Sequence, residues 1–119
     1  MILADSNAWL RYVIKRKEPD PTFAQLVLDG EVVTHPWVLG ELALGGVRPA
    51  TLTALAELRS LPVAPLPEVM DFIRRYHPRG VGWVDTNLLV SALEAEADVL
   101  TCDEGLRKNA ELHGRAAKS

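Results

Sequence analysis

Short apolar runs of the kind that form β-strands alternate with longer helical segments along this chain, and this alternation constrains the fold most. Strands are predicted at 1–4, 31–34 and 99–101, and residues 63–65 are a weaker candidate. Because parallel strands need crossover connections that are usually helical, the order predicts a mostly parallel sheet with helices on both faces. We therefore expect an α/β fold with three layers and a short central sheet.

Helical periodicity fills the segments between these runs. Pro and Gly residues mark the ends of the segments: Asp20 before Pro21 is a predicted N-cap, and Gly45 and Gly46 end a helix. The predicted helices cover residues 7–16, 22–30, 37–44, 49–61, 68–76 and 85–97. Residues 110–119 are only a weak candidate for a further strand.

Length and composition limit the class of protein. A chain of 119 residues, 48% of them hydrophobic, is long enough for one domain with a core and too short for two, so we expect a single domain over 1–119. The formal charge of −3 excludes the overall basic excess of an architectural nucleic-acid binder, so any RNA contact must be local.

The single cysteine and the N-terminal residues bear on the compartment. Cys102 on its own excludes an internal disulfide and a cysteine-based zinc site, and we expect it to be a buried, inert thiol. The chain shows no basic leader and no long apolar run, so neither a secretory signal nor a membrane span is predicted. A cytoplasmic protein is the expectation.

Four carboxylates lie where an α/β domain builds its site. Asp5 ends the first predicted strand, Asp103 follows a later one, Asp85 begins a helix, and Glu41 lies within a helix that is mostly apolar. Ligands of open α/β sheets gather beyond the carboxyl ends of the strands, so Asp5 and Asp103 are expected to face the same space. Asp85 can face it too, because its helix leads into the strand before Asp103.

Convergence of these acids requires a compensating charge. Two like charges about 4 Å apart repel by roughly 4 kcal/mol at an effective dielectric constant near 20. Oxygen ligands without a cluster of His or Cys favour Mg²⁺, with Mn²⁺ as the second choice, over zinc. Such ions activate water and orient phosphate groups, which makes phosphodiester hydrolysis the leading hypothesis.

A purely structural explanation exists for each acid taken alone. Asp5, Asp85 and Asp103 each precede or begin a helix, where N-capping by itself explains an aspartate. Glu41 lies between Trp37 and Leu44 on a mostly apolar helix, so a structural role for it is harder to explain. A position on a solvent-exposed face of that helix is the alternative. Only the combination of all four acids favours a functional site.

Three segments make the chain similar to the PIN-domain ribonucleases, and within them to the VapC-like toxins of toxin-antitoxin pairs. They are "ILADSNAWL", "WVLGEL" and "VDTNLLVSALEAEADVLTCDEGL", and the likeness covers nearly the whole chain. The resemblance implies a three-layer PIN-like fold and a Mg²⁺-dependent endoribonuclease whose catalytic residues are Asp5, Glu41, Asp85 and Asp103. It implies Asp5, Asp85 and Asp103 as metal ligands and Ser6 as a supporting residue.

The same resemblance implies partners. An RNA substrate, a cognate antitoxin that covers the site, and a homodimer are expected, with no membrane involved. The family usually closes its sheet with a further strand, for which this chain has only the weak segment 110–119. Glu104 adjoins Asp103, and we favour a role for it in stabilising the first turn of the following helix.

Cations and tryptophans add weaker predictions. Arg75, Arg79, Arg107 and Lys108 lie before or after the acids in the sequence and are candidate contacts to the RNA backbone, although each also fits a solvated surface. The tryptophans can stack on bases, but for each we favour core packing or a partner interface; they are Trp9, Trp37 and Trp83.

Other classes explain less of the sequence. A phosphatase of haloacid-dehalogenase type needs a second aspartate two residues after Asp5, where this chain has Asn7. A phosphoacceptor receiver domain would need a paired acid after the first strand and a lysine at a late strand end. Neither explains Glu41. A degenerate PIN module that only binds a protein stays open as the alternative from a different class.

Overall fold

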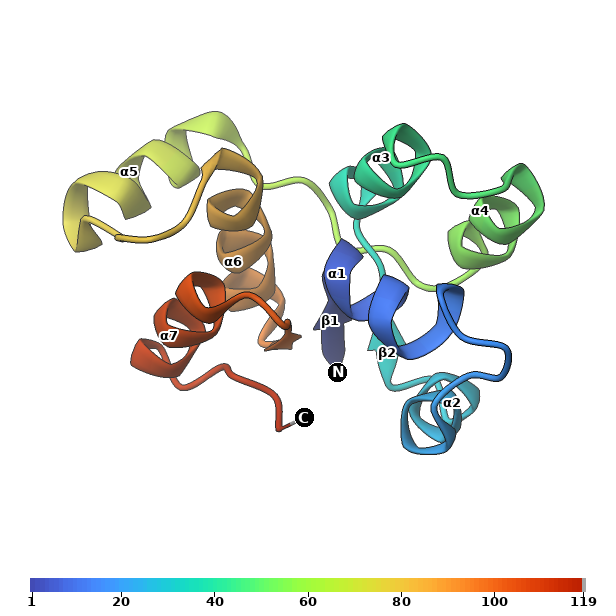
Figure 1. Cartoon of the computed structure of the whole chain (residues 1–119). Helices are drawn as coiled ribbons and strands as arrows, with labels where there is room; N and C mark the ends of the chain where they lie inside the picture. Colours follow the sequence, from blue (N-terminus) through green and yellow to red (C-terminus); the bar gives the residue numbers. More distant parts are fainter. Residues whose placement is uncertain (119) are drawn as a thin grey trace.

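A short parallel sheet lies between two groups of helices in the computed structural model, which describes residues 1–118 (Figure 1). Its strands, in the order β2-β1-β3, are β1 (Ile2–Ala4), β2 (Val32–Val33) and β3 (Asp98–Leu100). Both neighbours pair with β1 in parallel, so that Leu3 lies beside Val33 on one side and Val99 on the other. The prediction of a parallel central sheet is confirmed.

Helices α1 to α4 lie on one side of the strands in Figure 1, and α5, α6 and α7 lie on the other. This arrangement confirms the expected three layers. The helices are α1 (Ser6–Trp9), the π-helical turn η1 (Leu10–Ile14), α2 (Pro21–Leu28), α3 (Pro36–Leu44), α4 (Pro49–Ala56), α5 (Leu66–Tyr76), α6 (Trp83–Ala95) and α7 (Glu104–Leu112).

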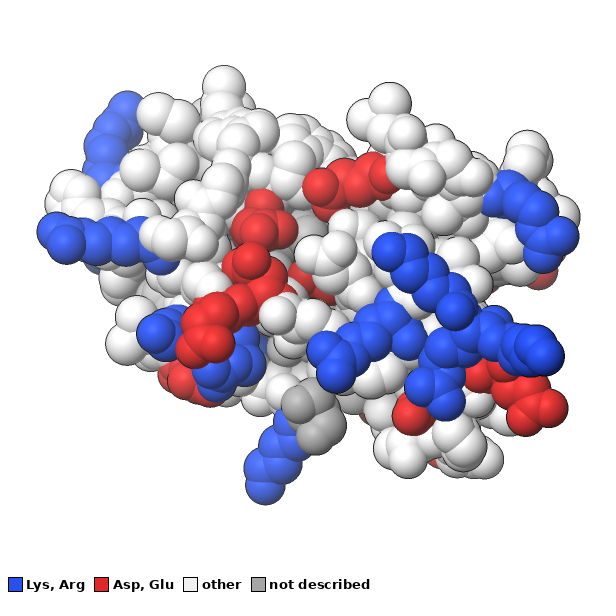
Figure 2. Space-filling model, viewed as in Figure 1, with Lys and Arg blue, Asp and Glu red and all other residues white. Residues whose placement is uncertain are grey.

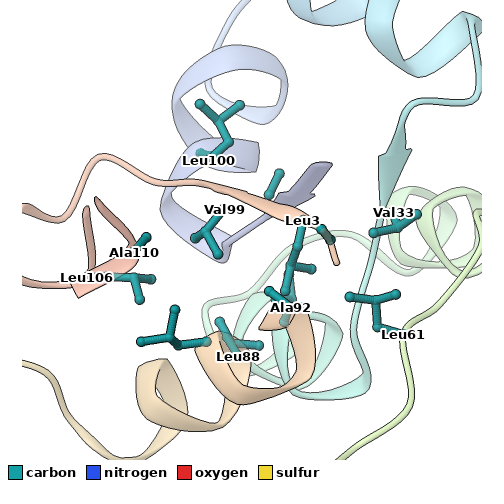
Figure 3. Packing of buried hydrophobic residues seen from close by; sticks show 14 of the residues in the cluster. Leu3, Val33, Leu61, Leu88, Ala92, Val99, Leu100, Leu106 and Ala110 are labelled. Atoms are coloured by element: carbon teal, nitrogen blue, oxygen red, sulfur yellow. The ribbon is translucent and has the colours of Figure 1, made fainter. Parts of the chain in front are cut away.

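The core joins the strands to α6 and α7. Leu3, Val99, Leu88 and Leu106 are all almost fully buried, and Figure 3 shows them meeting side by side. Burying each such side chain contributes roughly 1.5–3 kcal/mol relative to leaving it exposed. Helix α6 is buried without interruption over residues 86–92, as is typical of a helix at the centre of a domain.

The first predicted helix continues as a π-turn. The Lys15 amide donates to the Leu10 carbonyl at 2.9 Å, which is a bond to the fifth preceding residue. The spacing of apolar residues correctly predicted that Trp9 is buried and Arg11 is exposed. It could not distinguish a π-turn from an α-helix, because both have the same apolar residues in this segment. The N-cap at Asp20 is confirmed by its bond from the Phe23 amide at 3.0 Å.

The predicted strand at 63–65 is wrong. Thr34 instead forms an isolated parallel bridge with Ser60, through the Thr34 amide to the Arg59 carbonyl at 2.9 Å. Prolines 62 and 65 cannot donate backbone hydrogen bonds, so the chain leaves the edge of the sheet directly after this bridge.

Residues 110–118 form no strand: Glu104–Leu112 are α7, and the residues after it meet the edge of the sheet in one isolated bridge. Ala116 forms a parallel bridge with Val99, and the Ala117 amide donates to the Val99 carbonyl at 2.9 Å. Cys102 contradicts its prediction, because it lies beyond the end of β3 and its side chain is exposed. Among the residues that the structure describes, no helix has the length and apolar character needed to cross a membrane.

Candidate active site

Asp5 lies directly after β1 and is 3% exposed. It is the N-cap of α1, where its Oδ1 accepts a hydrogen bond from the Ala8 amide at 2.8 Å. Its Oδ2 accepts a second bond from the hydroxyl of Thr101. Both oxygens of this carboxylate are therefore held in place by the fold itself.

Asp103 is held in a similar way at the start of α7. Its Oδ2 accepts from the Leu106 amide at 2.8 Å, so Asp103 is the N-cap of this helix. The Asp103 amide donates to the Thr101 hydroxyl at 2.9 Å, and that hydroxyl donates to Asp5. Thr101 thus links the two aspartates, which we call the strand-end pair.

The sequence interpretation missed Thr101. The available signal was its place two residues before Asp103, where a Thr hydroxyl commonly bonds a nearby backbone amide. Its bond to Asp5, 96 residues away in sequence, has no such local signal.

Glu41 and Asp85 lie on helices and form what we call the helix pair. Glu41 is exposed on α3, and its Oε1 accepts from the Ser6 hydroxyl at 3.2 Å. Ser6, the predicted supporting residue, therefore contacts one of the four acids. The alternative of an exposed position for Glu41 is the one observed.

Asp85 lies in the first turn of α6 and does not cap it. The N-cap is Gly82, so the capping explanation for Asp85 is wrong. The helix begins earlier than predicted because Trp83 and Val84 already have helical conformation. Burial, followed by the charges of Asp5, Asp103 and Glu41, raises the pKa of Asp85 to about 6.

The four acids influence one another electrostatically. Burial raises the pKa of Asp5, hydrogen bonds from Thr101 and Ala8 lower it, and the charges of Glu41 and Asp103 raise it again. Figure 2 shows acidic side chains gathered in the middle of one face, between the two groups of helices. The ion pairs formed within residues 1–118 include none of the strand-end pair or the helix pair.

The donor chemistry of these acids fits a hard divalent cation, since all the ligands would be carboxylate oxygens. Within residues 1–118, however, no three His, Cys, Asp or Glu side chains are close enough together to hold a metal ion as they stand. The assignment of Asp5, Asp85 and Asp103 as metal ligands stays a prediction.

Some of the predicted cations are already paired. Arg107 bonds Glu104 at 2.9 Å and also pairs with Glu111, while Lys108 lies 3.6 Å from Glu104. These contacts place Glu104 in an ion-pair network on the exposed surface of α7, in its first turn. Arg107 and Lys108 are therefore weaker candidates for binding phosphate than the sequence suggested.

Other cations are more available. Arg79 is exposed, and Arg75 lies over the ring of Tyr76 at 6.0 Å. Figure 2 shows a further basic group over η1 and the loop that follows it, a group that the sequence interpretation missed. These exposed residues are Arg11, Lys15, Arg16 and Lys17. The four cations within the segment "RYVIKRK" were the sequence feature that indicated this basic group.

Comparisons with known proteins show the family of this chain. The family model of the PIN domain matches residues 2–112. The chain is 38% identical over 112 residues to Ribonuclease VapC32 of Mycobacterium tuberculosis, in strains CDC 1551 / Oshkosh and ATCC 25618 / H37Rv, covering 90% of this chain and 88% of each relative.

A solved structure supports the fold. The crystal structure of PAE2754 from Pyrobaculum aerophilum matches 98% of this chain and 87% of its own with a TM-score of 0.65, at 17% sequence identity. At that identity the likeness bears on the fold alone. The family model matches residues 2–112, and the curated relatives are 38% identical over 112 residues; the chain belongs to the PIN-domain family.

Proposed function

We propose that this chain is a metal-dependent endoribonuclease that hydrolyses RNA phosphodiester bonds and acts as the toxin of a toxin-antitoxin pair. The observation that supports this most is the group of four mutually repelling carboxylates with no ion-pair partner among residues 1–118. A fold keeps such a group when a cation and a substrate compensate for its cost. Mg²⁺ is the proposed ion, with Mn²⁺ as the second choice.

Each acid has a distinct proposed role. Asp5 and Asp103 provide fixed oxygens, because backbone amides and Thr101 already hold them. When bound, the metal supplies an activated water and orients the phosphate. Asp85 is the acid whose negative charge is least compensated, since its pKa is raised to about 6, and Glu41 is held by Ser6 at the open edge of the site.

Two observations support RNA as the substrate: the relatives are named ribonucleases, and the chain has exposed cations. Phosphate contacts position a nucleic acid without specifying its sequence. We propose that Arg75, Arg79 and the basic group over η1 provide these contacts, since their charges lie outside the acidic group. Arg107 and Lys108 contribute less because Glu104 shares their charge.

The partners remain proposals as well. We propose a cognate antitoxin, a homodimer and a cytoplasmic location, and that residues 1–119 form one domain. A degenerate module that only binds protein is the alternative; retention of all four acids argues against it. Light scattering and co-purification with the product of the neighbouring reading frame test the assembly.

Cleavage of structured RNA tests the activity. With Mg²⁺ or Mn²⁺ the native protein should cut RNA, and Asp5→Asn and Asp103→Asn should each reduce the rate by at least roughly 100-fold. Asp71→Asn, which removes an exposed acid on α5, is the matched control and should cut normally. Intact RNA with the native protein, or equal cleavage by all four proteins, would refute the proposal.

Metal binding has a separate readout. A cation that binds only the folded state should raise the melting temperature in proportion to the logarithm of its concentration. The shift should be present in the native protein and in Asp71→Asn, and reduced in Asp85→Asn. Equal shifts in all three proteins would place the cation elsewhere.

A further inference from the structure

Two tryptophans lie against each other, one on each of the helices that carry Glu41 and Asp85. The rings of Trp37 and Trp83 have centroids 6.3 Å apart and are tilted by 54°. Trp37 precedes Glu41 by one turn of α3, and Trp83 begins α6 two residues before Asp85. The pair therefore joins the same two helices that carry the helix pair of acids.

The two rings differ from the third tryptophan in how much of them is open to solvent. Trp9 is 2% exposed and packs edge-on against Phe23 at 5.0 Å, which makes it a core residue. Trp83 is 45% exposed, and its neighbour Trp37 is half-buried. Core packing explains Trp9 and does not explain Trp83, whose ring has a supporting neighbour on one side and solvent on another.

We infer that Trp83, supported by Trp37, is a stacking surface for a nucleobase of the RNA next to the phosphodiester bond that is cut. This inference rests on the ribonuclease function proposed above. Trp37 and Glu41 are four residues apart on α3 and therefore share a face of that helix. The Trp83 ring contacts Trp37, so a base stacked on it belongs to a nucleotide near the acid carried by α3.

Stacking suits this location for an electrostatic reason. Where the proposed cation does not neutralise them, the four carboxylates repel the phosphates of RNA, so contacts that do not depend on charge add binding energy near them. An aromatic ring provides such a contact to any base, because every base has a π-face. The exposed cations over η1 and near Arg79 then act on phosphates farther along the chain.

The same argument predicts a modest sequence preference. Stacking strength, rather than hydrogen bonding to base edges, would discriminate between bases at this position. Larger purine rings should therefore be preferred to pyrimidines beside the cut, without an absolute requirement for one base.

Cleavage kinetics test the stacking surface. Trp83→Ala should lower kcat/KM by about fivefold to about 150-fold, mostly through KM, while Trp83→Phe should keep most of the native value. Leu44→Ala is the matched control, because Leu44 is an apolar residue of α3 that is 92% exposed and has no π-face. Circular dichroism of each variant checks that it is folded.

A binding experiment separates this inference from the proposed function. In Asp103→Asn protein, a short single-stranded RNA should quench tryptophan fluorescence, and an oligonucleotide with an abasic nucleotide at the bound position should quench less. Adding Trp83→Ala should remove most of the quenching. If this pattern appears but the native protein cuts no RNA, then base stacking stands while the ribonuclease proposal fails.

Two outcomes would overturn the inference. The first is a native protein that cuts RNA while Trp83→Ala cuts it with unchanged KM, which leaves the ribonuclease proposal intact. The second is unchanged RNA binding by Trp83→Ala together with loss of self-association or of antitoxin binding. That result would assign the two rings to a protein interface.

Discussion

The strand-end pair and the helix pair differ in how the fold holds them. Asp5 is almost fully buried and accepts two hydrogen bonds, whereas Glu41 is exposed and accepts one at 3.2 Å from Ser6. Asp5 and Asp103 also cap α1 and α7, so folding requires their positions whether or not a ligand is bound. The strand-end pair is therefore positioned before any ligand binds, whereas the side chains of the helix pair are free to move when a ligand binds.

The difference has a structural origin. Asp5 and Asp103 follow adjacent parallel strands, so the register of β1 and β3 brings them to the same edge of the sheet. Glu41 and Asp85 depend instead on how α3 and α6 are placed, through contacts of these helices and their preceding loops with other elements. His35 and Gly105 make two of these contacts.

Breaking the link at Thr101 should have the largest effect. Thr101→Val leaves the methyl group and removes the hydroxyl, so Asp5 loses a donor and the Asp103 amide loses its acceptor. We expect a loss of activity of about 10- to 100-fold and a loss of roughly 1–3 kcal/mol in unfolding free energy. Cleavage rates and urea unfolding measure the two effects.

Thr101→Ser is the control for that change, because it keeps the hydroxyl and removes only a methyl group. It should retain most of the activity. A Val variant as active as the Ser variant would show that the strand-end pair does not need this link.

His35 joins the helices on the other side of the site. Its Nδ1 accepts from the Trp37 amide at 3.1 Å, and its Nε2 lies 3.0 Å from the Ser91 hydroxyl of α6, which donates to the Pro62 carbonyl. The ring is fully buried, and burial lowers its pKa to about 4. The ring is therefore neutral at physiological pH.

Acid should weaken this contact in a defined pH window. The unfolded His35 binds a proton below its ordinary value of 6.5, and the folded one only below about 4. Between these values the unfolded state binds more protons, so stability falls as the pH falls, by up to roughly 3 kcal/mol in total. Urea unfolding at a series of pH values measures the slope.

His35→Asn isolates that contribution, since Asn can still cap α3 but does not titrate. The variant should lack the decline that His35 causes between pH 6.5 and 4. Asp85 titrates in the opposite sense but is present in both proteins, so its effect cancels in the difference. Parallel pH profiles for the two proteins would contradict the prediction.

Gly105 joins the two halves of the site. A Cβ at this position would lie 1.9 Å from the Gly80 carbonyl oxygen, because the loop before α6 rests on the start of α7. Asn109 reinforces that contact by donating to the Arg79 carbonyl at 2.8 Å. Gly105→Ala should therefore destabilise the protein by roughly 1–3 kcal/mol, although alanine favours helices.

Gly40 supplies a matched comparison on α3, where an added Cβ would meet nothing within 4 Å. Gly40→Ala should stabilise the protein by roughly 0.5–1 kcal/mol, since it removes only the entropic cost of glycine in a helix. Opposite signs for the two variants in urea unfolding are expected. The same sign for both would mean that the loop does not dock on α7.

Sequence reasoning found the α/β fold, the parallel sheet and the PIN family, because strand and helix periodicity and three local segments carry that information. It wrongly predicted a strand at 63–65 and a buried thiol at Cys102. The burial of a residue beyond the end of a strand depends on which other elements pack against it. The four acids were named from the sequence, and their metal binding and catalysis remain to be tested.

The order of strands and helices and several of their caps followed from the sequence, since caps, prolines and apolar spacing act within a few residues of one another. Some ends did not: α6 begins at Trp83 rather than at residue 85, and α4 ends at Ala56 rather than at residue 61. Contacts between elements required the folded structure: the Thr101 link between two aspartates, the raised pKa of Asp85 and the solvent-exposed ring of Trp83. These depend on burial and on charges distant in sequence, whose energies follow distance in space.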